Sequence, residues 1–210
     1  MKRALLIVAV LAAVAAAFFG LAGGNAPEAA PPPKAAKLAE AVFAGGCFWC
    51  TEADFDKVRG VVSTTSGYAG GRIANPTYEQ VSAGGTGHYE AVRIVYDPAK
   101  VSYAQLVSHF FKTVDPLDGG GQFCDRGDQY LSAIFVAGED ERRIAEGTKG
   151  RAARRLGKPI ATHVLPAARF WPAEGYHQDY YTRNPVRYRF YRFNCGRDAR
   201  LREVWGDAGK

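Results

Sequence analysis

The beginning of the fold is set by residues 41–58, AVFAGGCFWCTEADFDKV. The first four residues of this stretch are apolar and predict a short buried strand, which Gly45 and Gly46 end. From Phe48 onward, apolar side chains recur at helical spacing. The strand therefore passes through a glycine turn directly into a helix, and Cys47 stands at the first turn of that helix.

The same alternation of strand and helix continues along the chain. A helix begins after Ser102, a preferred N-cap residue, and ends before Pro116. Beyond Phe170 the aromatic and basic residues show weak periodicity, which predicts a long C-terminal coil with short helical turns. We expect further strands at residues 61–66, 88–96 and 130–136, and helices at residues 103–114 and 139–156. The order of elements up to Val136 predicts an α+β fold, a ferredoxin-like split β-α-β sandwich.

Composition restricts the class of protein. The chain has 210 residues, of which 47% are hydrophobic and 23% charged, so it can bury a core and is neither disordered, collagen-like nor a coiled coil. A net charge of +6 is spread along the sequence. The one basic cluster, within residues 151–158, fits a solvated helix face better than a nucleic-acid contact. We expect no nucleic-acid partner.

The amino end has the pattern of an export signal. Lys2 and Arg3 precede an apolar run, and residues 4–22 would span about 28 Å as a helix. Cleavage at the small residues that follow would release an exported, periplasmic protein, whereas an uncleaved segment would anchor it to the inner membrane through residues 4–22. The predicted division is residues 1–24 as signal peptide or membrane anchor, 25–37 as an Ala/Pro-rich linker, and 38–210 as the catalytic domain.

Four cysteines lie in the predicted domain. An even number in an oxidising compartment fits two fixed disulfides in a non-enzymatic module, but Cys47 and Cys50 form a C-x-x-C pair that is typical of redox or metal chemistry. A structural zinc site usually needs two close pairs, and Cys124 and Cys195 are far apart in sequence, so we expect no metal. The chain also carries no nucleotide-cofactor fingerprint, and we expect no cofactor.

Cys47 is the predicted nucleophile. At a helix N-terminus, unpaired N–H groups and the helix dipole stabilise a thiolate, which predicts a lowered pKa. A buried inert cysteine would instead lie within an element and not directly after two glycines. Phe48 and Trp49 are either core residues or the walls of a small apolar pocket beside the thiol.

Glu90 is the predicted general acid. It lies in GHYEAVRIVYD, residues 87–97, where strand alternation places it on the same face as Val92 and Ile94. Burial would raise the pKa of its carboxyl and leave it protonated near neutral pH, whereas a wet strand end would not. Loops elsewhere offer further hydroxyl and carboxyl groups on Tyr78, Asp125 and Tyr130.

The chain resembles the A-type peptide methionine sulfoxide reductases over residues 40–190. The matching motifs, in chain order, are GGCFWCTE, GYAGG, NPTYEQV, GHYEAVRIVYDP, DRGDQYLSAIF and AEGYHQDYYTRNP. The resemblance implies reduction of methionine S-sulfoxide, free or in proteins, by an enzyme that a thioredoxin-type donor recycles. We expect the chain to act as a monomer. The resemblance assigns Cys47 as the attacking thiol and Glu90 as the acid that protonates the sulfoxide oxygen. It also implies a methyl pocket of Phe48 and Trp49, oxygen contacts from Tyr78 and Tyr130, and a site lined by Asp125. His177 and Gln178 match a motif of the same family, and we expect a structural role for them.

This chain departs from many relatives in the thiols that could resolve the resulting sulfenic acid. Many relatives carry Gly at position 50 and Asn at position 124, where this chain has cysteines. We rank Cys195 first, because we expect it in a mobile tail that can reach Cys47. Cys50 ranks second, as a direct or relay thiol on the same helix. Cys124, next to Asp125, ranks third.

A second function remains open from the residues. A periplasmic thiol-disulfide oxidoreductase would use the Cys47–Cys50 pair on the same strand–turn–helix unit. The bulky residues between the two cysteines would crowd a protein disulfide, and Glu90 would have no task in that reaction.

Overall fold

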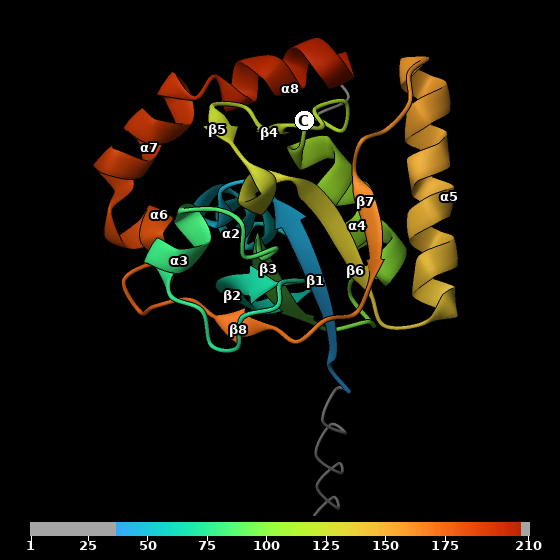
Figure 1. The fold of residues 1–210 in the computed structure, drawn as a ribbon. Coiled ribbons are helices and arrows are strands. Elements are labelled where there is room, and N and C mark those ends of the chain that lie inside the picture. Colours follow the sequence, from blue (N-terminus) through green and yellow to red (C-terminus); the bar gives the residue numbers. More distant parts are fainter. Residues whose placement is uncertain (1–36, 207–210) are drawn as a thin grey trace, which may run out of the picture. The chain divides into compact units, whose positions relative to one another are not determined.

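A six-stranded mixed sheet lies at the centre of the computed structural model, which describes residues 37–206 (Figure 1). The strands of this sheet are β1 (Ala39–Gly45), β2 (Val61–Ala69), β3 (Tyr89–Tyr96), β6 (Ser132–Val136), β7 (His163–Pro166) and β8 (Trp171–Pro172). A separate hairpin pairs β4 (Gly121–Gln122) with β5 (Asp125–Arg126). The helices are α2 (Phe48–Phe55), α3 (Tyr78–Ser82), α4 (Tyr103–Thr113), α5 (Glu139–Leu156), α6 (Tyr180–Arg183), α7 (Pro185–Asn194) and α8 (Arg197–Trp205), with a 3-10 turn η1 (Asp128–Tyr130).

The strand order, β7-β6-β1-β3-β2-β8, confirms the predicted topology. The four central strands, β6, β1, β3 and β2, pair antiparallel with one another, and α2 and α4 make the two crossovers of a split β-α-β unit. β7 adds to β6 in parallel and β8 adds to β2 antiparallel, so the sheet is wider than the predicted core. At the β8 edge Gly67 permits the pairing, because a Cβ there would lie 2.3 Å from the Trp171 carbonyl oxygen.

The main core fills the space between the sheet and helices α2 and α4. Phe43 of β1 stacks on Phe55 of α2, with ring centroids 5.1 Å apart, and on Phe110 of α4 at 5.2 Å. All three rings are fully buried. Because aromatic pairs of this kind contribute about 0.5–1.5 kcal/mol beyond burial, this stack fixes α2, and hence Cys47, against the strand that precedes it.

The predicted start of the second crossover helix is confirmed. Ser102 accepts a hydrogen bond from the Gln105 backbone N–H, and the Gln105 side chain accepts one from the Ser102 backbone N–H, so the two form a capping box. The long surface helix α5 has the predicted bounds, residues 139–156.

The predicted C-terminal coil is wrong, because α6, α7 and α8 occupy most of residues 180–205. The pattern of α7 misled the prediction because aromatic residues lie on both of its faces: Tyr188 is buried, whereas Phe190 is 70% exposed. Arg197 of α8 is buried, and its Nη2 donates to the carbonyl oxygens of Gly45 and Thr113 at 3.2 and 2.8 Å. These bonds fix α8 to the turn that precedes Cys47.

The predicted signal peptide or anchor and almost all of the predicted linker lie outside the described residues. Within residues 37–206, no helix combines the length and apolar character needed to cross a membrane.

Candidate active site

The turn between β1 and α2 places Cys47 as the N-cap of α2. Gly46 has φ +77°, and a Cβ there would lie 2.5 Å from Cβ of Gln122, so this position requires glycine. The Cys47 carbonyl accepts backbone hydrogen bonds from Cys50 and Thr51 at 3.1 and 3.2 Å. The thiol therefore stands at the start of the helix, as predicted.

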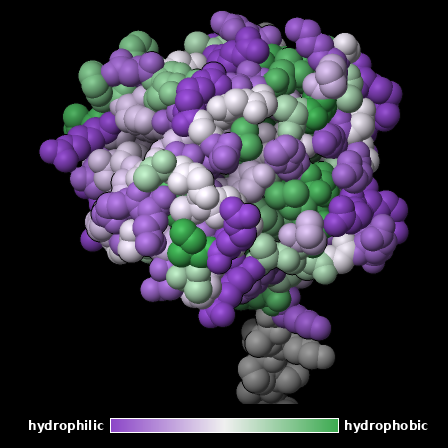
Figure 2. Space-filling view, viewed as in Figure 1, coloured by the Kyte–Doolittle hydropathy of each residue, from purple (hydrophilic) through white to green (hydrophobic). Residues whose placement is uncertain are grey.

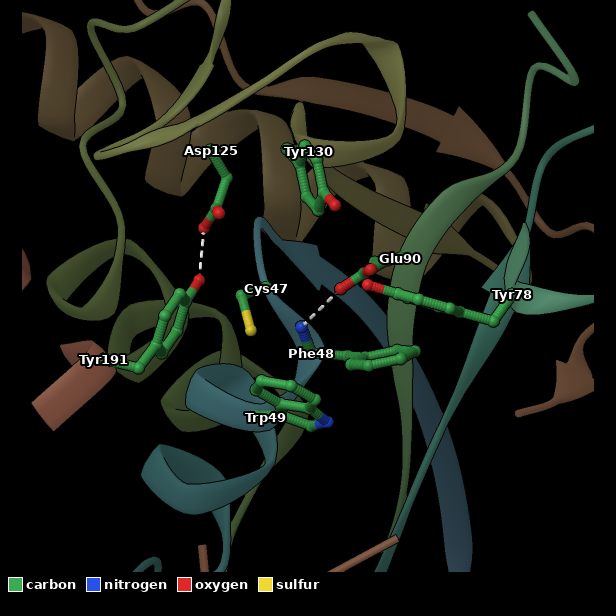
Figure 3. A pocket seen from close by; sticks show the side chains of 8 residues that line it. All are labelled: Cys47, Phe48, Trp49, Tyr78, Glu90, Asp125, Tyr130 and Tyr191. Carbon is green, nitrogen blue, oxygen red and sulfur yellow. Dashed lines mark hydrogen bonds between the residues drawn. The ribbon is translucent and has the colours of Figure 1, made fainter. Parts of the chain in front are cut away.

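Cys47 opens into a small cavity. Figure 3 shows the Cys47 sulfur between Glu90 on one side and the Asp125–Tyr191 pair on the other, with the Trp49 indole beside it. The cavity brings together seven residues that the sequence singled out and one that it did not, Tyr191. Its lining residues are Cys47, Phe48, Trp49, Tyr78, Glu90, Asp125, Tyr130 and Tyr191.

Glu90 is buried, as the strand alternation predicted, and only 3% of it is exposed. Its Oε2 accepts a hydrogen bond from the Phe48 backbone N–H at 3.0 Å. Burial raises the pKa of Glu90 to about 8, against an opposing effect of that hydrogen bond. The carboxyl is therefore mostly protonated at neutral pH and can act as an acid.

The predicted lowering of the Cys47 pKa is wrong. The residue is 6% exposed, and burial raises the pKa of its thiol well above the ordinary value, with a further rise from Cys50 and Glu90. The field of the helix N-terminus does not offset this loss of solvation. The hydrogen bond from Cys47 lowers the pKa of Cys50 to about 7, helped by Arg197 and Arg192, so the pair carries its negative charge on Cys50.

An aromatic cluster fixes the orientation of the Trp49 indole. Its Nε1 donates to Nδ1 of His177 at 3.0 Å, and its ring stacks on Tyr180 with centroids 3.7 Å apart. His177 is 2% exposed and also contacts the Phe48 ring, at a centroid distance of 4.9 Å. Burial lowers the pKa of His177, which keeps its ring neutral and Nδ1 able to accept.

Gln178 acts on the backbone of β2. It accepts from the Ser66 N–H and donates to the Ser66 carbonyl oxygen, both at 2.9 Å, and it also donates to the Ala173 carbonyl oxygen. These contacts agree with the structural role expected for His177 and Gln178.

Two phenols complete the wall on the Glu90 side. Tyr78 begins α3, and its backbone N–H donates to Oε1 of Glu174 at 2.8 Å. Tyr130 ends the 3-10 turn η1. Burial raises the pKa of both phenols, so they stay protonated and can donate hydrogen bonds into the cavity.

Tyr191 of α7 is the lining residue that the sequence analysis missed. Its hydroxyl donates to Oδ2 of Asp125 across a separation of 66 residues, and it also interacts with the Cys47 side chain. No local pattern in the sequence marks it, because its partner lies on the β4–β5 hairpin. The nearest signal in the sequence was Cys195, which lies one helical turn after Tyr191.

Cys124 and Cys195 form a disulfide with their Cα atoms 4.8 Å apart. Cys124 is exposed in the turn of the β4–β5 hairpin, and Cys195 caps the end of α7, so the expectation of a mobile tail around Cys195 is wrong. Cys47 and Cys50 are free thiols. The reading of four cysteines as two fixed disulfides therefore does not hold.

Comparison with known proteins gives one family. The peptide methionine sulfoxide reductase family model matches residues 39–209. Peptide methionine sulfoxide reductase MsrA 2 of Rhizobium meliloti (strain 1021) is 55% identical over 174 residues, which cover 83% of this chain and 87% of the relative. Among solved structures, methionine sulfoxide reductase A of Corynebacterium diphtheriae is 36% identical, with a TM-score of 0.64, over 71% of this chain and 76% of that one. Reduced Mxr1 from Saccharomyces cerevisiae is 30% identical, with a TM-score of 0.68, over 71% and 87%.

Proposed function

The chain belongs to the peptide methionine sulfoxide reductase family, a family of oxidoreductases, and from that premise we propose that its cavity binds methionine S-sulfoxide and reduces it to methionine. The observation that carries the proposal is that Cys47 and the protonated Glu90 face one cavity lined by aromatic rings. The cavity is small and lined by aromatic rings and a few polar groups, which suits a single methionine side chain, either free or at an exposed position of a protein.

The first step transfers oxygen from the substrate to Cys47. A sulfoxide carries partial negative charge on oxygen, so attack at its sulfur becomes easy only when that oxygen is protonated or strongly hydrogen-bonded. Glu90 gives the proton, and Tyr78 and Tyr130 donate hydrogen bonds to the same oxygen. Cys47 Sγ bonds to the substrate sulfur, its own proton returns to Glu90, and the oxygen ends on Cys47 as a sulfenic acid. The methionine sulfur gains two electrons and the Cys47 sulfur loses two.

The aromatic residues hold the substrate's methyl group. Phe48 is buried beneath the cavity and Trp49 forms its side, where His177 and Tyr180 prevent the indole from turning. A rigid apolar wall next to a line of oxygen-binding groups distinguishes methyl from oxygen at the sulfur centre. This arrangement supports selection of one sulfoxide epimer, which we assign as S.

We propose Cys50 as the thiol that resolves the sulfenic acid, ahead of Cys195, which the sequence ranks first. Cys50 is a free thiol three residues from Cys47 in sequence, and the interaction with Cys47, together with Arg197 and Arg192, lowers its pKa, which favours the reactive thiolate. Its attack on Cys47 Sγ expels the oxygen as water and forms a Cys47–Cys50 disulfide. Cys195 is already bonded to Cys124.

Single Cys→Ser variants test this order. Cys50→Ser should reduce one equivalent of sulfoxide and then stop as a Cys47 sulfenic acid that dimedone traps. Cys195→Ser should form the Cys47–Cys50 disulfide, identified by mass spectrometry of peptides. A Cys47–Cys195 disulfide in the wild-type enzyme after one turnover would restore the sequence-based ranking.

The reductase activity itself is tested with methyl p-tolyl sulfoxide and dithiothreitol. One enantiomer should be consumed and the other should remain, as chiral chromatography measures. Cys47→Ser is the control for uncatalysed reduction. Survival of both enantiomers with the wild-type enzyme would end the proposal.

A thiol-disulfide oxidoreductase using Cys47 and Cys50 is not favoured. The two residues are 6% and 1% exposed, and Trp49, which lies between them in sequence, lines the same cavity as Cys47. A protein disulfide is bulkier than a single methionine side chain and has less access to these sulfurs, and Glu90 would have no task in its exchange.

We also propose that the enzyme works after export, on the strength of the apolar segment at residues 4–22. Mass spectrometry of the mature amino terminus tests this. A terminus near residue 25 means release into the periplasm, an intact terminus with membrane association means an anchor, and an intact chain in the cytosol would contradict the proposal.

A further inference from the structure

A hollow lies where α4, α5 and the end of α8 meet, and it shares no lining residue with the Cys47 cavity. Its floor consists of Phe111, Ala152 and Trp205, which are buried and apolar. The hollow has a volume of about 140 Å³ and is open to solvent. An apolar cavity of about 150 Å³ takes up one benzene ring, so this hollow has room for a ring.

The Trp205 indole is held in place by polar contacts. Its Nε1 donates to the Val114 carbonyl oxygen at 3.2 Å, so the polar atom of the ring already has a partner. Nη2 of Arg155 donates to the Trp205 carbonyl oxygen at 2.9 Å, and the guanidinium carbon lies 5.6 Å from the centroid of the indole ring. These contacts join the end of α8 to the C-terminal end of α5 (Figure 1). What the ring still offers a ligand is therefore its carbon surface.

Cations surround this apolar floor. Lys112, Arg151 and Arg155 line the hollow and are exposed, and the two arginines lie four residues apart on one face of α5. Within residues 37–206 none of the three forms a salt bridge, and no Asp or Glu lines the hollow. Figure 2 shows mostly hydrophilic residues along the edge of the molecule formed by α5, so an apolar floor beside this helix is an exception. An anion would stabilise the three like charges.

The aromatic floor and the basic rim together select the chemistry of a ligand. Pockets for small molecules usually combine apolar walls with a few polar groups that fix the orientation of the ligand. Phe111 and Trp205 favour an aromatic ring over an aliphatic chain, because aromatic pairs attract each other beyond the effect of buried area. Arginine binds a carboxylate through two parallel N–H···O bonds, and such charge-assisted bonds are stronger than neutral ones.

We propose that this hollow, the α4–α5–α8 site, binds an aromatic carboxylate, with the ring against Phe111 and Trp205 and the carboxylate on Arg151 and Lys112. Nη2 of Arg151 donates to Oγ1 of Thr148 on the same helix, which leaves the other N–H groups of this guanidinium for a ligand. The proposal does not depend on the reductase activity, because the site and the Cys47 cavity have no residue in common.

The site also accounts for part of the basic cluster that the sequence analysis assigned to a solvated helix face. The cluster contains Arg151, Arg154, Arg155 and Lys158, all of them exposed. Arg151 and Arg155 line the site, whereas Arg154 and Lys158 do not. Replacing Arg154 and Lys158 therefore changes the net charge as much as replacing Arg151 and Lys112, and leaves the site intact.

The test is an NMR titration of the full chain with 3-phenylpropionate, an aromatic carboxylate with one ring. The uncharged 3-phenylpropan-1-ol is the matched control ligand. The chain has three tryptophans, and single Trp→Phe variants assign their indole N–H signals. The Trp205 signal should shift and saturate with a Kd of about 5 mM or tighter, which is usual for a ligand of this size. The alcohol should bind at least about tenfold more weakly.

Two double variants locate the carboxylate. Lys112→Gln with Arg151→Gln should weaken the binding of 3-phenylpropionate at least about tenfold, because both partners of the carboxylate are lost. Arg154→Gln with Lys158→Gln removes the same charge outside the site and should stay within about twofold of wild type. Both double variants replace exposed side chains, so their melting temperatures should lie close to that of wild type.

Four results would overturn the proposal. One is an unshifted Trp205 signal at about 20 mM 3-phenylpropionate. Another is equal binding of the alcohol, because the carboxylate would then contribute nothing. Equal weakening by the two double variants would mean that net charge alone attracts the ligand. A shift of the Trp49 signal in place of the Trp205 signal would put the ligand in the Cys47 cavity.

Discussion

Replacing Glu90 by Gln should abolish most activity and at the same time stabilise the fold at neutral pH. Glutamine keeps the size of the side chain and can still accept the hydrogen bond from the Phe48 N–H. It cannot give a proton to the sulfoxide oxygen, so kcat/KM should fall by about 10²–10⁴. The stability change follows from the other property of Glu90, a carboxyl that is ionised in the unfolded chain and neutral in the folded one.

The size of the stabilisation can be calculated from the pKa values. The folded pKa is about 8 and the usual value is 4.5, so the wild-type free energy of unfolding declines as pH rises from about 4.5 to about 8. Integrated over that interval, the loss is about 4 kcal/mol at pH 7.5 and less than about 1 kcal/mol at pH 5. Glu90→Gln has no such loss, so the difference between its free energy of unfolding and that of wild type should grow by about 3 kcal/mol from pH 5 to pH 7.5.

Urea unfolding followed by tryptophan fluorescence at pH 5 and pH 7.5 measures this difference. Glu40→Gln, at an exposed position of β1, is the control and should change stability by less than about 0.5 kcal/mol at either pH. If the advantage of Glu90→Gln is the same at both pH values, or if the variant is less stable than wild type at pH 7.5, Glu90 is not a buried neutral acid and the mechanism loses its proton donor.

Three further predictions concern the activity and the residues that position the site. The kcat/KM of the wild-type enzyme should fall as pH rises past about 8, where Glu90 loses its proton, and a rate still rising at pH 9 would contradict its role as acid. His177→Ala should raise the KM for sulfoxide more than it lowers kcat, because the Trp49 indole loses its acceptor, and the reverse split would refute this. Gly46→Ala should destabilise by about 1–3 kcal/mol in urea unfolding. Gly138→Ala, with no atom within 4 Å, should differ little from wild type, and equal effects would refute the argument from φ.

The elements that the sequence predicted correctly carry a clear local pattern: an apolar alternation, a run of apolar residues or a helix cap. β3 alternates clearly, so Glu90 could be placed on the buried face, and α4 has both a capping box and an apolar stripe. The helix α7 has aromatic residues on every side, because one face closes the cavity with Tyr191 and the other exposes Phe190. Periodicity is lost in such a segment although the helix is regular.

The residues of the candidate site were predictable where one motif carries several of them. Properties that depend on tertiary contacts, such as a pKa or a disulfide pairing, were not. The acidity of Cys47 depends on a balance between the helix field and desolvation, and only the packing shows that desolvation dominates. The pairing of Cys124 with Cys195 likewise depends on where α7 ends relative to the β4–β5 hairpin.

The order of the cavity's walls along the chain has a consequence for biosynthesis. Cys47 emerges early, whereas Tyr191, which closes the last side, lies 144 residues further along the chain (191 − 47). A growing polypeptide therefore carries its reactive sulfur without an enclosing chamber until α7 has been made. For a chain that crosses a membrane unfolded, catalysis would begin only after the final helices have arrived on the far side.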